Sequence, residues 1–152
     1  MKLRSGSLGT RLLILLPAAT LICGWGTLVN QLGLVPMMRA ERHRFVWIAA
    51  IGLFLATAAS EARIETWGWK RAVVRGALAG YVVSAVAYLS MEIGRAGFIP
   101  TIGLVRQPRS VGIFLFWCVI CGLWLFSAAA WCAAAVIGSR LQRQTQDGSK
   151  RE

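Results

Sequence analysis

The sequence predicts an all-α polytopic membrane protein whose four transmembrane helices form one bundle. Three observations lead to this fold class. The 152 residues have a mean hydropathy of +0.60, and only 15% of them are charged, whereas a soluble domain carries about 25% charged residues. The charged residues also lie in short clusters between apolar runs. We expect one four-helix domain over residues 1–140 and a polar, disordered tail over residues 141–152.

Each predicted helix corresponds to one apolar run, taken in chain order. The first and fourth runs fill charge-free gaps that are longer than the roughly 20 residues needed to cross a bilayer. The second and third runs, 45–60 and 76–91, have sixteen residues each, and a re-entrant hairpin or buried core helices are the alternative for them. Arg75 can extend the third run by snorkelling into the headgroup layer. The predicted spans are 12–35, 45–61, 72–91 and 111–138.

The distribution of basic residues predicts the orientation of the bundle. With four spans both termini lie on one side, and that side carries eleven of the 17 lysines and arginines, against six on the other. Basic residues in short loops favour the cytoplasmic side. We therefore expect a cytoplasmic (inner) membrane protein with both termini in the cytoplasm. The net charge of +11 predicts contact with anionic lipid headgroups rather than with nucleic acid, because the basic residues lie between apolar runs.

Small residues recur at every fourth position of the third run, at Gly76, Gly80 and Ser84. Such a ridge lets another helix backbone approach closely, and close packing is what holds helices together in lipid. We predict that this ridge packs inside the bundle. A docking groove for a partner protein is the alternative.

The fourth run contains a Cys-x-x-Cys pair, Cys118 and Cys121, in the uncharged stretch "CVICGLWLFSAAAWC". On one continuous helix, at about 100° per residue, both cysteines share a face with Gly122 and Ala129. Cysteine behaves there as a small apolar residue, which predicts a helix-packing face. We expect no metal site, because zinc takes four ligands and the one histidine, His43, falls in a distant loop.

The same cysteine pair allows a second interpretation, a small membrane thiol oxidoreductase. Four helices and a Cys-x-x-Cys early in the fourth superficially resemble the vitamin K epoxide reductase family. That resemblance would make Cys118 and Cys121 the quinone-facing pair. The family also has a shuttle pair of cysteines after its first helix, and residues 35–44 contain none. Burial in hydrocarbon disfavours the reactive thiolate. A reducible Cys118–Cys121 disulfide in acid-quenched membranes would favour this alternative.

A second resemblance concerns three short segments, "NQLGLVP", "RHRFVWIAAIG" and "SVGIFLFW". They are similar to segments of the small four-helix membrane subunit of tripartite periplasmic (TRAP) transporters. The family's paired glutamates before its arginine are absent here, where only Glu41 is near. The resemblance implies a non-catalytic partner of a larger permease subunit. The positions that correspond to the family's pattern are Arg42, Phe45, Val46, Trp47, Gly52, Gly112, Ile113 and Trp117.

The apolar runs carry no enzyme constellation. Charged residues inside a membrane usually mark ion or proton paths, and the interiors of the four runs have none. Glu92 and Arg95, three residues apart, are expected to pair at a helix end. Pro17 is the only helix-breaking residue in these runs, and proline is tolerated in membrane helices. We predict a non-catalytic accessory or small subunit, without cofactor or metal, that packs against a larger membrane protein such as a transporter permease, or that self-associates.

Overall fold

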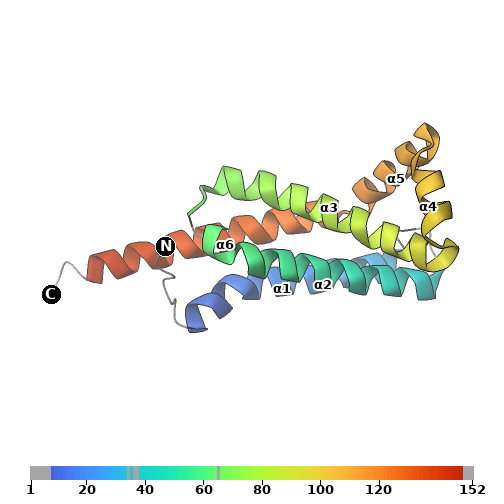
Figure 1. Ribbon diagram of the computed structural model, residues 1–152. Helices are drawn as coiled ribbons and strands as arrows, with labels where there is room; N and C mark the ends of the chain where they lie inside the picture. Colours follow the sequence, from blue (N-terminus) through green and yellow to red (C-terminus); the bar gives the residue numbers. More distant parts are fainter. Residues whose placement is uncertain (1–7, 34, 36–37, 65, 149–152) are drawn as a thin grey trace.

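The protein is built from helices alone over the residues that its structure, a computed structural model, describes: 8–33, 35, 38–64 and 66–148 (Figure 1). Four helices are long and apolar enough to span a membrane, which confirms the predicted fold class. Two shorter helices join the third long helix to the last. In chain order they are α1 (Leu8–Leu32), α2 (Arg39–Ile64), α3 (Trp69–Ala96), α4 (Phe98–Val105), α5 (Pro108–Ile120) and α6 (Leu123–Gly148).

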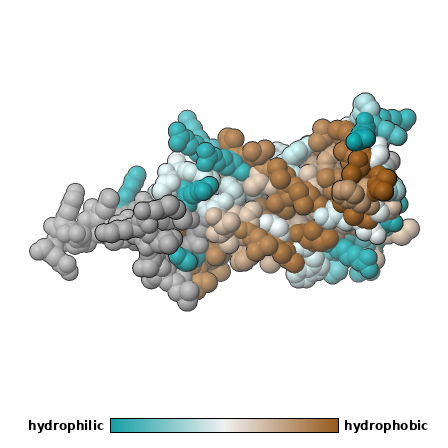
Figure 2. Space-filling model, viewed as in Figure 1, coloured by the Kyte–Doolittle hydropathy of each residue, from teal (hydrophilic) through white to brown (hydrophobic). Residues whose placement is uncertain are grey.

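The four long helices run along one common axis, and α1 begins at the same end of the bundle at which α6 finishes (Figure 1). At the opposite end α4 turns across the bundle, and α5 returns from it at an angle to meet α6. The space-filling view shows apolar side chains over the middle of the visible face and hydrophilic ones towards its two ends (Figure 2). This banded surface is the one that a bilayer about 30 Å thick requires.

The α3 helix places its small residues inside the bundle and its large ones outside. This arrangement reverses that of a soluble amphipathic helix, and it fits hydrocarbon surroundings. Lipid tails solvate a valine or leucine as well as a protein core does, so the interior gains more from close backbone approach. The buried residues are Ala72, Gly76, Gly80, Ser84 and Ala87, and the exposed ones include Val74, Leu78, Val82 and Val86.

The most extensive helix contact in the described part of the chain is between α3 and α6, followed by those of α1 with α6 and with α2. The core that these contacts enclose holds a few large side chains among many small ones. Trp25, Ile14, Leu53, Ile64 and Leu123 are its largest fully buried apolar members.

The prediction of one continuous helix over 111–138 is wrong. The α5 helix ends at Ile120 and α6 begins at Leu123. Between them Gly122 has a φ of +69°, a left-handed conformation that ends a helix and that glycine adopts without steric cost. The α1 helix continues through Pro17, in keeping with the tolerance of membrane helices for proline.

The expected disordered tail differs from the structure as well. The α6 helix continues through Gly148, so the prediction is wrong for residues 141–148, and residues 149–152 lie outside the described part. The physical reason is local, because arginine, leucine and glutamine are good helix formers and here extend a helix that already exists. Charged ends likewise lengthen α2 and α3, which begin before and finish after the apolar runs that predicted them.

Candidate functional site

The helix breaks between α5 and α6, and the residues around this break, 118–124, are called the joint. The joint packs against the middle of α3. Residues on both sides of the midpoint of α3 contact it. The thiol of Cys121 donates a hydrogen bond to the hydroxyl of Ser84, at 3.2 Å, and a Cβ placed on Gly80 would lie 2.8 Å from the carbonyl oxygen of Leu123. The broken helix therefore lies near mid-depth of the bundle, the position at which transporters place their discontinuous helices.

Side chains of the protein engage three backbone carbonyls of the joint. A helix end leaves carbonyl oxygens unpaired, and in lipid each must find a partner within the protein. The indole of Trp25 donates to the carbonyl of Cys121 at 2.6 Å, and the indole of Trp124 donates to that of Val119 at 3.1 Å. The thiol of Cys121 also lies 3.1 Å from the carbonyl of Cys118. These contacts make the joint a structural element, with carbonyls engaged internally.

The predicted helix-packing residues fall into different places around this joint. Cys118 and Cys121 are buried, and both are free thiols. Gly122 forms the bend itself, and Ala129 is exposed. The shared face that we expected assumed one straight helix. The bend changes the direction of α6 relative to α5, so angles counted from Cys118 do not carry over to α6.

The glycine ridge of α3 packs against the first turns of α6. A Cβ on Gly76 would lie 2.8 Å from the carbonyl oxygen of Ser127, and one on Gly80 would lie 2.7 Å from the Cα of Trp124. Both distances are below any normal contact of a Cβ atom, so the absence of a side chain at these two glycines is what lets the backbones of α3 and α6 approach so closely. The ridge is thus occupied inside the chain by α6.

A chain of contacts between aromatic, hydroxyl and guanidinium groups connects α2, α3 and α6 nearer the chain termini. The indole of Trp131 donates to Oγ1 of Thr57 at 3.0 Å, and Thr57 is itself fully buried. The ring centroid of Trp67 lies 5.8 Å from that of Trp131, and the guanidinium of Arg75 lies 4.4 Å from the ring of Trp67. A guanidinium on an indole face is a favourable cation–π contact, so Arg75 is held against the protein by Trp67.

A cleft of about 590 Å³ opens at the far end of the bundle, where α5 leaves it. Four charged side chains line it, namely Glu41 and Arg44 from the first turns of α2 and Glu92 and Arg95 from the last turns of α3. The rest of the lining is mostly apolar, with Ser90 and the phenol of Tyr88 as its polar groups and Trp117 contributed by α5. Sequence reasoning missed this site, since its parts are far apart in the chain and each part alone resembles an ordinary helix end.

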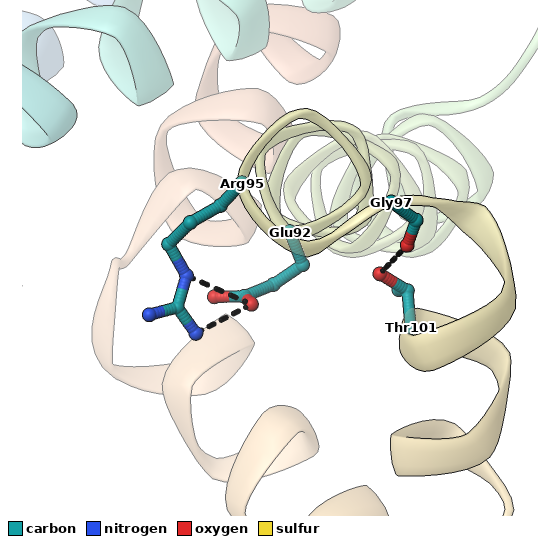
Figure 3. Close-up of polar contacts among 4 residues, drawn as sticks. All are labelled: Glu92, Arg95, Gly97 and Thr101. Carbon is teal, nitrogen blue, oxygen red and sulfur yellow. Dashed lines mark hydrogen bonds and ion pairs between the residues drawn. The ribbon is translucent and has the colours of Figure 1, made fainter.

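Two polar contacts lie at the α3–α4 corner beside the cleft, shown in Figure 3. The expected pairing of Glu92 with Arg95 is confirmed, because Nη2 of Arg95 lies 3.0 Å from Oε2 of Glu92 and its Nε lies 3.3 Å from the same oxygen. The hydroxyl of Thr101 in α4 donates to the carbonyl of Gly97 at 2.8 Å. Gly97, with a φ of +87°, ends α3 and turns the chain into α4.

A scan against protein-family models and searches of curated proteins and of solved structures found no match. Within the described residues no group of three or more histidine, cysteine or acidic side chains could hold a metal ion. The joint and the cleft are the two features of the described residues at which polar groups gather within the bundle.

Proposed function

We propose that this multi-pass membrane protein is a non-catalytic accessory subunit that packs against a larger membrane protein, such as a transporter permease. The observation that supports it most directly is the course of α5. This mostly apolar helix has 13 residues. At 1.5 Å per residue it is about 20 Å long, which is too short to cross a bilayer alone. It also diverges from the bundle, so its outer side, with Ile113, Phe116 and Val119, is exposed.

The neighbouring α4 helix adds to the same apolar surface. Phe98 and Ile99 are 63% and 82% exposed, and α4 crosses the end of the bundle (Figure 1), where headgroups rather than lipid tails surround a spanning protein. Large apolar side chains gain little free energy from contact with a polar headgroup layer, whereas contact with a protein surface would bury them. A partner lying along α4 and α5 would cover this surface and complete the bundle.

The transport role within this proposal comes from the resemblance to the small subunit of TRAP transporters. The segments that carry the resemblance meet in space. Val35 of the first segment and Arg44 of the second both line the cleft. Trp117 of α5 faces the same cleft as Arg44 of α2. This convergence supports a shared role for the segments.

Photo-crosslinking in native membranes tests the proposal. A benzophenone amino acid at Phe116 is expected to give one covalent adduct with a larger membrane protein, because this position lies on the uncovered side of α5. The same amino acid at Leu78, an exposed position of α3, is the matched control and should label lipid only. Equal protein adducts at both positions, no adduct at Phe116, or an adduct of twice the chain's mass would contradict a larger partner at α5.

We also propose that the protein lies in the inner membrane with both termini in the cytoplasm. It is supported by the basic residues, eleven against six. A single cysteine at Gly68 or at Ser110, in a chain whose four native cysteines are replaced, reports the two sides. We expect an impermeant maleimide to label intact cells at position 110 and not at position 68. The reverse pattern would show the opposite orientation.

A further inference from the structure

We infer that the cleft between α2, α3 and α5 binds one zwitterionic phospholipid whose headgroup carries a phosphate and a primary ammonium. The volume of about 590 Å³ lies within the roughly 300–1,000 Å³ of ligand pockets. Small residues make this room, since Gly94 and Ser90 line the α3 wall. A Cβ on Gly94 would meet no atom within 4 Å, so the wall here faces open space.

The charges of the cleft suit a headgroup that carries both signs. Two carboxylates and two guanidinium groups line it, so neither a purely anionic nor a purely cationic ligand matches them. Both hydrogen bonds from Arg95 go to Oε2 of Glu92, so this carboxylate keeps acceptor capacity for an ammonium N–H (Figure 3). Arg44 has no ion-pair partner among the described residues, and its guanidinium can pair with phosphate.

The polarity of the cleft changes with depth, as that of a lipid does. The charged residues lie in the outermost turns of α2 and α3, and one turn further in come Ile48, four residues after Arg44, and Tyr88, four residues before Glu92. Residues four apart lie on the same helix face, so the side chain of Ile48 and the ring of Tyr88 continue the same walls inwards. Trp117 closes the α5 side. A headgroup at the mouth thus has room for its acyl chain against the inner wall.

Native mass spectrometry of the purified protein, with lipids added back in detergent, measures this binding. Phosphatidylethanolamine is expected to bind once, and about tenfold more tightly than phosphatidylglycerol, which has no ammonium, or phosphatidylcholine, whose ammonium has no N–H to donate. Glu92→Gln should remove that preference, whereas Arg109→Gln, outside the cleft, should keep it. Equal binding of the three lipids, or an unchanged preference in Glu92→Gln, would overturn the assignment.

A second pair of variants keeps the test independent of the Glu92–Arg95 pair. Gly94→Trp fills the cleft and should lose the bound lipid, whereas Gly112→Trp, also at a glycine whose Cβ would meet no atom within 4 Å, should retain it. Retention by Gly94→Trp would place the lipid elsewhere. Soluble glycerophosphoethanolamine is expected to compete at least tenfold less well than the intact lipid, and equal competition would refute a site that holds the acyl chain. None of these measurements needs a partner protein, so their failure is distinct from failure of the accessory role.

Discussion

The substitution Gly80→Leu is expected to be strongly destabilising, at about 3 kcal/mol or more, because it forces α3 away from α6. Overpacking typically costs about 1–3 kcal/mol, and more where the surroundings cannot give way. A Cβ on Gly80 would already lie 2.7 Å from the Cα of Trp124 and 2.8 Å from the carbonyl oxygen of Leu123. These are backbone atoms, so no rotation of a side chain relieves the contact, and the helices themselves must separate.

Thermal unfolding of the detergent-purified protein, followed by circular dichroism, measures this effect. A loss of about 3 kcal/mol corresponds to a fall in Tm of roughly 6–12 °C for a chain of this size. Gly80→Ala should give a smaller fall in the same direction. Gly94→Leu is the matched control on the same helix, because a Cβ there meets no atom within 4 Å. It should leave the Tm unchanged or raise it slightly through helix propensity. Similar losses for Gly80→Leu and Gly94→Leu would contradict the backbone contact.

Trp25→Ala is expected to be about as damaging, because it empties a core position and releases a carbonyl of the joint. Trp25 is 1% exposed, and truncating a buried tryptophan to alanine costs about 3–5 kcal/mol. Trp25→Phe separates the two contributions, since it keeps an aromatic ring but leaves the carbonyl of Cys121 without its indole partner, at about 1–3 kcal/mol.

Two readouts distinguish a loosened joint from a general loss of packing. Thermal unfolding reports stability, and the rate of maleimide labelling of Cys121, as the single cysteine, reports opening of the joint. Trp25→Phe should accelerate that labelling. Trp47→Ala is the control, because Trp47 is 58% exposed and an exposed substitution changes stability by about 0.5 kcal/mol or less. Trp25→Phe with an unchanged Tm and an unchanged labelling rate would show that the indole does not hold the joint.

Several features of this protein could be predicted from its sequence because they depend on the local chain alone. The length of an apolar run against the thickness of a bilayer decides whether a helix can span it, and this comparison predicted the four long helices. The spacing of residues three or four apart on one helix also depends only on the local chain. It predicted the pairing of Glu92 with Arg95, and it identified Gly76 and Gly80 as one ridge.

The tertiary structure alone decided where a helix breaks and what each face meets. Gly24 and Gly26 lie in an apolar run and remain helical in α1, whereas Gly122 lies in a similar run and ends one. Sequence patterns do not separate these cases, because a break inside lipid is tolerated only where another helix satisfies the released carbonyls. Trp25 does so for Cys121 from 96 residues away. That one bend decides which side of α6 meets the glycine ridge, leaves Ala129 exposed, and directs α5 away from α2 to open the cleft.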